Sequence, residues 1–184
     1  MIAVPLDDQS RVLLDVVGRL EREGIEYMIS GSIALSAYVR PRMTRDIDVV
    51  VDVGTNQVDA LLRAFRGDYY FDDEAARRAV AERRLINAVH ESTLVKVDLV
   101  IRKDGPFRQA EFDRRGWVTV HGRQIRFVSP EDLLLSKLLW GAESGSAMQL
   151  ADAKLLAALE LDWPYVKRWA AVLGLTESVE GLKR

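Results

Sequence analysis

The stretch from residue 29 to residue 53, ISGSIALSAYVRPRMTRDIDVVVDV, decides how the rest of the chain is interpreted. Its β-branched run from Ile47 to Val53 predicts a buried strand, and Asp46 and Asp48 lie at the start of that run. Side chains alternate across a strand, so both carboxylates point to one face and Ile47 to the other. Two carboxylates on one face repel each other, and burying them unpaired would cost several kcal/mol. A divalent cation would remove that conflict, and a site made of oxygen ligands favours Mg²⁺ or Mn²⁺.

A third acidic residue, Asp98, lies in a second predicted strand, TLVKVDLVI, at residues 93–101. In that strand Val97 and the apolar residues at every second position from it point to the core face. This leaves Lys96 and Asp98 on the opposite face. If the two strands are neighbours, Asp98 joins Asp46 and Asp48. Three carboxylates on adjacent strands could hold two metal ions, one activating an attacking hydroxyl and one bound to a triphosphate.

The Gly31-Ser32 pair precedes a short predicted helix, IALSAY. Glycine lets the backbone approach a phosphate closely, and the N–H groups at a helix N-terminus favour an anion. The Ser32 hydroxyl adds a donor. A simpler alternative is a strand-to-helix turn in which Ser32 is only the N-cap. Metal-binding acids beside a phosphate cradle predict the transfer of a nucleotidyl group from an NTP.

These motifs together resemble the nucleotidyltransferases of the DNA polymerase β-like superfamily. The signature of that family is a hydrophobic residue, Gly-Gly or Gly-Ser, a spacer, and then Asp-hydrophobic-Asp. Here it is Ile29-Ser30-Gly31-Ser32, thirteen residues, and Asp46-Ile47-Asp48. The resemblance implies an α/β (α+β) fold with a mixed sheet flanked by helices. It also implies that Asp46 and Asp48 bind metal, and that Asp98 is a third carboxylate that helps to deprotonate the acceptor hydroxyl.

The C-terminal stretch SPEDLLLSKLLWGAESGSAMQLADAKLL, residues 129–156, is similar to the AbiEii-type subgroup, which includes toxins of toxin–antitoxin pairs. That resemblance implies that Lys137 contacts the triphosphate, that Asp152 lies near the site, and that an antitoxin is a partner. The chain departs from the subgroup's pattern at Leu150-Ala151, where the subgroup has an arginine–aspartate pair.

The residues themselves place Lys137 and Asp152 in two apolar predicted helices. The Lys137 stem must cross apolar surface, as it would if the residue only reached from its helix to solvent. Asp152 could equally be a surface or structural acid. An ion pair between Lys137 and Asp152 that bridges the two helices would explain both positions.

The 184 residues divide into a predicted α/β core, 1–128, and a C-terminal helical part, 129–184. In the core we expect helices near 10–23, 55–65 and 72–84, strands at 26–30, 47–53, 85–90 and 93–101, and a hairpin formed by 117–120 and 124–128. Three helices are expected in the second part, with N-caps at Ser129, Ser146 and Asp162. Ser146 and Gln149 also fit a capping box.

The composition of the chain argues against several other classes of protein and of site. The chain has no cysteine, which excludes a disulfide scaffold, a thiol nucleophile and a cysteine-based zinc site. Its two histidines, His90 and His121, make a histidine-rich metal site unexpected. A formal net charge of −2 does not indicate a general nucleic-acid-binding field. We expect no signal peptide, no membrane span and a cytoplasmic location.

Simpler interpretations exist for the acids. Asp46 and Asp48 could be solvated groups paired with Arg42 or Arg45, and Asp98 could be a surface acid on an edge strand. The leading hypothesis is instead a metal-dependent nucleotidyltransferase that moves an NMP from an NTP to an acceptor hydroxyl and releases pyrophosphate. The acceptor remains open: an RNA 3′ end, a protein hydroxyl or a small molecule. The alternatives are a non-catalytic nucleotide- or partner-binding relative, and an aminoglycoside-type transferase.

Overall fold

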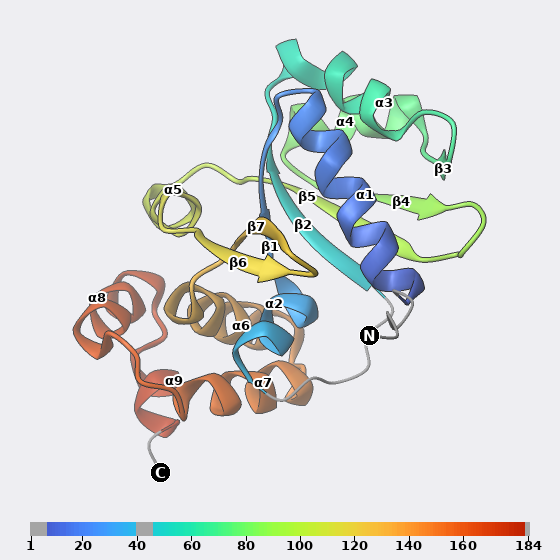
Figure 1. Ribbon diagram of the computed structural model, residues 1–184. Helices are drawn as coiled ribbons and strands as arrows, with labels where there is room; N and C mark the ends of the chain where they lie inside the picture. Colours follow the sequence, from blue (N-terminus) through green and yellow to red (C-terminus); the bar gives the residue numbers. More distant parts are fainter. Residues whose placement is uncertain (1–6, 40–45, 183–184) are drawn as a thin grey trace, which may run out of the picture.

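The computed structural model describes residues 7–39 and 46–182 and contains a mixed sheet of seven strands, in the order β3-β4-β5-β2-β1-β7-β6 (Figure 1). The strands are β1 Glu26–Ile29, β2 Asp46–Asp52, β3 Tyr69–Tyr70, β4 Leu85–His90, β5 Lys96–Ile101, β6 Gly116–Val120 and β7 Arg123–Phe127. The helices are α1 Asp8–Arg22, α2 Gly31–Tyr38, the 3₁₀ turn η1 Thr55–Gln57, α3 Val58–Phe65, α4 Asp73–Glu82, α5 Pro106–Asp113, α6 Pro130–Ser144, α7 Ala147–Ala157, α8 Trp163–Leu173 and α9 Thr176–Gly181. The expected α/β fold is therefore confirmed.

The centre of the sheet is β2, which pairs antiparallel with β1 and parallel with β5. Along β2, Ile47, Val49 and Val51 are completely buried, and the residues between them are only partly buried. The same alternation holds along β5, where Val97 and Leu99 are buried. This is the pattern expected when one face of a strand packs on the core. Since β5 lies between β4 and β2, the alternative that placed Asp98 on an edge strand is wrong.

Helix α3 packs against both α1 and α4 on the core side of the sheet (Figure 1). Helix α1 begins at the N-cap Asp7, whose side chain accepts a hydrogen bond from the Ser10 N–H, and the chain leaves the helix through Gly24 at φ +67°. Five apolar residues of α1 at helical spacing are all buried. They are Val12, Leu13, Val16, Val17 and Leu20.

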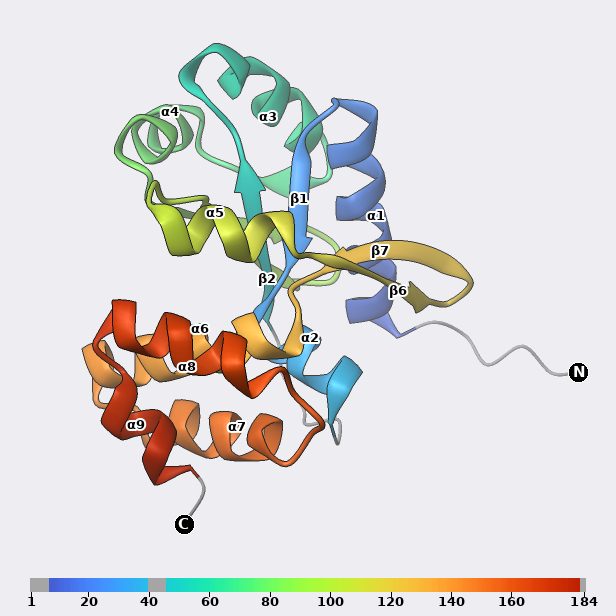
Figure 2. The same ribbon diagram turned by 90° about the vertical axis from the view of Figure 1, so that its left-hand side faces the viewer.

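The helices α6 to α9 gather at the other end of the molecule, with α2 packed against α6 and α7 (Figure 2). The predicted caps at Ser129 and Asp162 are confirmed, because each side chain accepts a hydrogen bond from the N–H three residues later. The predicted box at Ser146 is wrong, since its side chain makes no capping hydrogen bond to any described residue. Among the described helices, none is long and apolar enough to cross a membrane.

Candidate active site

The parallel register of β2 and β5 brings the predicted acids together. Asp48 lies directly opposite Asp98, and Asp46 lies opposite Lys96. Residues in register on neighbouring strands share a face, so the three carboxylates and Lys96 lie on the same side of the sheet, away from the core. The structure thus confirms that the two strands are neighbours. Arg42 and Arg45, the alternative partners of these acids, lie outside the described residues.

Asp48 has an unusual electrostatic environment. Burial raises the pKa of its carboxyl group, and the neighbouring charge of Asp98 raises this pKa further. Lys137 and a hydrogen bond from the Ser32 backbone N–H act in the opposite direction. A buried carboxylate with an acidic neighbour is the arrangement that a bound cation would relieve.

Lys96 partly supplies that positive charge. Its Nζ lies 2.9 Å from Oδ1 of Asp98 and donates a hydrogen bond of 3.1 Å to Oδ2. This hydrogen bond, together with the charges of Asp98, Asp46 and Asp48, raises the pKa of Lys96. Lys96 therefore contacts both oxygens of Asp98, one through this hydrogen bond and the other through the ionic contact.

The donor atoms fit a hard divalent ion in kind, since carboxylate oxygens are what Mg²⁺ and Mn²⁺ prefer. Asp46 and Asp48 offer such oxygens on one face of the sheet, whereas both oxygens of Asp98 already contact the Lys96 ammonium. Within residues 7–39 and 46–182, however, no three acidic or histidine side chains already converge as ligands of one ion. A metal ion would therefore have to draw these side chains together.

Gly31 allows the start of α2 to lie directly against Asp48. Its φ is +62°, and a Cβ at this position would lie 1.9 Å from Oδ2 of Asp48 and 2.8 Å from its Cβ. The neighbouring Ser30 N–H donates a 2.9 Å hydrogen bond to the Asp48 backbone carbonyl. The N-cap of α2 is Ser30, so the alternative in which Ser32 caps the helix is wrong. The first turn of α2 and the carboxylate of Asp48 thus form one compact unit.

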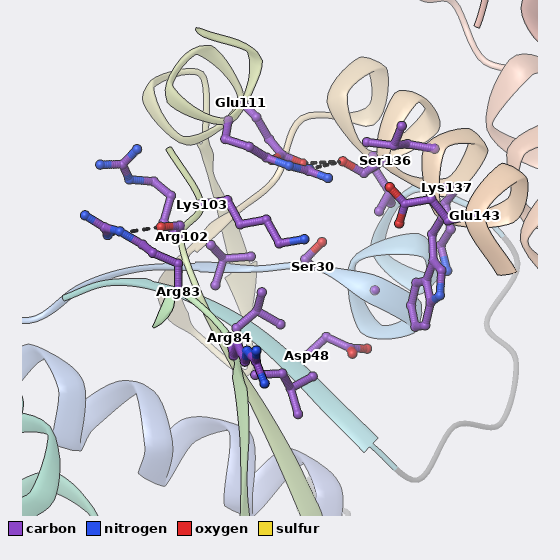
Figure 3. Close-up of a pocket in the computed structure, with 18 residues that line it drawn as sticks. Ser30, Asp48, Arg83, Arg84, Arg102, Lys103, Glu111, Ser136, Lys137 and Glu143 are labelled. Atoms are coloured by element: carbon purple, nitrogen blue, oxygen red, sulfur yellow. Dashed lines mark hydrogen bonds and ion pairs between the residues drawn. The ribbon is translucent and has the colours of Figure 1, made fainter. Parts of the chain in front are cut away.

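A cavity of about 600 Å³ extends from this unit between the sheet, α5 and α6 (Figure 3). Val50, Leu85 and Val100 form an apolar part of its lining on the sheet side. In the view of Figure 3, Asp48 and Lys137 lie toward one side, and Arg83 and Arg102 toward the other. The remaining lining residues are Ser30, Gly31, Arg84, Lys103, Arg108, Glu111, Leu133, Ser136, Leu139, Trp140 and Glu143.

Lys137 and Asp152 form a buried ion pair that links α6 to α7, with 2.9 Å between Nζ and Oδ2. Each residue is 3% exposed. The bridge suggested by the sequence is therefore present. Lys137 also lines the cavity and acts electrostatically on Asp48, whereas Asp152 does not line the cavity.

Sequence reasoning missed a polar cluster on the side of the cavity that α5 and α6 form. Arg108 donates to Oε2 of Glu111 at 2.8 Å and to Oγ of Ser136 at 2.7 Å, and Ser136 donates to the other Glu111 oxygen. Glu111 is almost fully buried, and this burial raises its pKa. The cluster joins α5 to α6. Its helix α5 was not predicted, although Gly105-Pro106 is a typical helix-start signal.

Comparisons with solved structures identify the fold. The lincosamide antibiotic adenylyltransferase LnuA, bound to lincomycin, shares 15% identity over 85% of this chain and 100% of its own, with a TM-score of 0.55. An antigenic nucleotidyltransferase-like protein from Paracoccidioides brasiliensis shares 18% identity over 97% of this chain and 94% of its own, with a TM-score of 0.57. The chain has the nucleotidyltransferase fold.

A third solved structure with this fold is ANT(2")-Ia in complex with adenylyl-2"-tobramycin. It shares 14% identity over 91% of this chain and 98% of its own, with a TM-score of 0.56. No model of a protein family matches the chain, and no curated protein matches it. The similarity is thus one of structure, and at these identities it concerns the fold.

Proposed function

We propose that the chain is a metal-dependent nucleotidyltransferase that transfers an NMP from an NTP to an acceptor hydroxyl. The observation that carries this proposal is the position of Asp48. Its carboxylate lies between the glycine-led start of α2 and Asp98 on the neighbouring strand, at the edge of a 600 Å³ cavity. That volume lies within the range of roughly 300–1,000 Å³ usual for small-molecule sites.

The residues divide the work as follows. The first turn of α2, with Gly31 and Ser32, receives the triphosphate, and Lys137 approaches it from α6. Asp46 and Asp48 hold Mg²⁺ or Mn²⁺, which neutralises phosphate charge when bound. Asp98 accepts the proton of the acceptor hydroxyl. The acceptor oxygen forms its bond to the α-phosphorus while the bond to the bridging oxygen of pyrophosphate breaks, so positioning and charge neutralisation carry the catalysis.

The nucleoside part of the NTP fits the apolar section of the cavity. Val50, Val100 and Leu85 offer an uncharged surface on the sheet side, and Trp140 of α6 lines the same cavity. An aromatic side chain of this kind stacks on a base with little preference among bases.

The deciding experiment measures pyrophosphate release from each NTP with Mg²⁺ and a cell extract as the source of acceptors. We expect the activity of the Asp48→Asn variant to fall at least a hundredfold, because the substitution removes a negative charge that holds the metal ion during the reaction. Asp59→Asn is a matched control, since Asp59 is an exposed aspartate on α3 that pairs with Arg77. Full activity of Asp48→Asn, or no pyrophosphate release by the native chain, would contradict the proposal. The second result would favour a non-catalytic nucleotide-binding protein.

Two acceptor classes have specific support. LnuA with lincomycin and ANT(2")-Ia with an adenylylated tobramycin act as precedents for a small-molecule acceptor on this fold. The AbiEii-type resemblance of residues 129–156 favours a toxin acting on RNA. Expression in a susceptible bacterium separates them: antibiotic resistance supports the first, and growth arrest relieved by Asp48→Asn supports the second.

A further inference from the structure

Lys96 lies among the three carboxylates of the candidate site. It is the cross-strand partner of Asp46 and lies two residues before Asp98, so it shares their face of the sheet. Its ammonium is within 3.1 Å of both Asp98 oxygens. Charge attraction from Asp46 and Asp48 also acts on it.

The position of the ammonium limits where a metal ion can bind. The Asp98 side chain is 14% exposed and that of Lys96 is 40% exposed, so the lysine reaches inward from solvent to a largely enclosed carboxylate. A Mg²⁺ or Mn²⁺ ion on the same carboxylate needs an oxygen at about 2.1 Å. Such an ion would lie within a few ångströms of the ammonium, where two positive charges repel strongly in a poorly hydrated site.

We propose that Lys96 is a built-in cation that takes the place of one of two metal ions, an inference that rests on the proposed function. The site then binds a single divalent ion, at Asp46 and Asp48, instead of the two ions that three carboxylates suggest. Lys96 is a positioning residue in this arrangement. It fixes Asp98 toward the acceptor side and supplies there the positive charge that a second ion would otherwise bring.

The test counts Mn²⁺ ions bound per chain by electron paramagnetic resonance, with one equivalent of a non-hydrolysable NTP analogue. Metal binding to the analogue without protein gives the baseline. We expect one Mn²⁺ in the native chain and one in Lys96→Arg, which keeps the charge. We expect two in Lys96→Met, the second binding within about tenfold of the first, because the competing charge is gone.

Lys167→Met is the matched control, since it removes an exposed lysine from α8, away from the cavity, and should keep one Mn²⁺. Two ions of similar affinity in the native chain, or a single ion in Lys96→Met, would overturn the inference and leave the transferase proposal standing. Absence of both Mn²⁺ binding and pyrophosphate release in the native chain would overturn the proposed function itself. If Lys96→Met does not fold, Lys96→Gln replaces it, and the number of Mn²⁺ ions bound by the native chain still tests the inference.

Discussion

Gly31 is the residue at which backbone geometry and chemistry are most closely joined. Replacing it with alanine adds the strain of a left-handed conformation, about 1–3 kcal/mol, and a contact of 1.9 Å with Oδ2 of Asp48. Rotating the Asp48 side chain would move Oδ2 but not the Asp48 Cβ, which would itself lie only 2.8 Å from the new methyl group. We expect Gly31→Ala to lower both the melting temperature and pyrophosphate release, the latter by tenfold or more.

Gly24 provides the control for this substitution. Its φ of +67° is similar, but a Cβ there would meet no atom within 4 Å. Gly24→Ala should therefore show the conformational strain without loss of activity. Equal effects of the two substitutions would mean that the contact between Gly31 and Asp48 has no special role.

Asp48 illustrates the conflict between stability and function. Because burial and Asp98 raise its pKa, the folded chain holds the Asp48 proton more tightly than the unfolded chain does. The charged form therefore destabilises the fold at neutral pH, and this penalty disappears as the pH falls through the folded pKa toward the unfolded value of 3.8.

We accordingly expect metal-free Asp48→Asn to melt above the native chain at pH 7.5, while the gap closes near pH 4. For a chain of this length, each kcal/mol corresponds to about 2–4 °C. Thermal denaturation in a chelating buffer measures the difference. If Asp48→Asn is instead less stable than the native chain at pH 7.5, the charged form of the Asp48 carboxylate stabilises the fold, and this expectation is wrong.

At the scale of elements, the pair between Lys137 and Asp152 connects α6 and α7. Removing one partner of a buried pair leaves an uncompensated charge and costs about 3–5 kcal/mol, whereas replacing both with apolar residues is often neutral. Lys137→Met and Asp152→Leu should each destabilise the chain, and the double variant should recover much of the loss.

Activity separates the two roles of this pair. If Lys137 also contacts the triphosphate, the stable double variant remains inactive. Denaturant unfolding and pyrophosphate release, measured on the same samples, give both answers. A double variant that regains activity along with stability would reduce Lys137 to a structural residue.

The sequence predicted the elements that have strong periodic patterns. Strands β2 and β5 alternate clearly, and the side on which Asp46, Asp48 and Asp98 lie followed from that alternation. The short elements α5, β3 and α9 were missed. Helix α5 has eight residues, and helices so short depend on tertiary packing, here the burial of Phe107 and Phe112.

Two predictions about the starts of helices were wrong in detail. The helix expected from residue 55 begins as the 3₁₀ turn η1, after an N-cap at Gly54, and becomes α-helical only at Val58. At the start of α7, Gln149 is buried, and its Cβ packs close to Gly141 of α6. The predicted N-cap position, Ser146, is correct, and only the side-chain hydrogen bonds of the predicted box are not found among the described residues.

At the scale of the whole molecule, the cavity is lined by the sheet and α2 on one side and by α5 and α6 on the other. A ligand that fills it contacts parts that are far apart in sequence and stabilises them together. Sequence reasoning could place the acids, but not the cavity wall, because the approach of α5 to α6 depends on the Glu111 cluster.

We therefore expect an NTP with Mg²⁺ to raise the melting temperature of the native chain as one transition. A ligand at a hundredfold excess over its Kd stabilises by ~2.7 kcal/mol, which corresponds to roughly 5–10 °C here. Asp48→Asn should show a smaller increase. An equal increase in both proteins would place the nucleotide away from Asp48.

Trp140 gives the cavity an optical reporter of its own. The indole lines the cavity and is 51% exposed, so its emission depends on water that an incoming base would displace. Titration with an NTP should shift the intrinsic fluorescence toward the blue, and Trp140→Phe should abolish that shift while the other tryptophans still emit. Nucleotide affinity can thus be read without labels and before any acceptor is known.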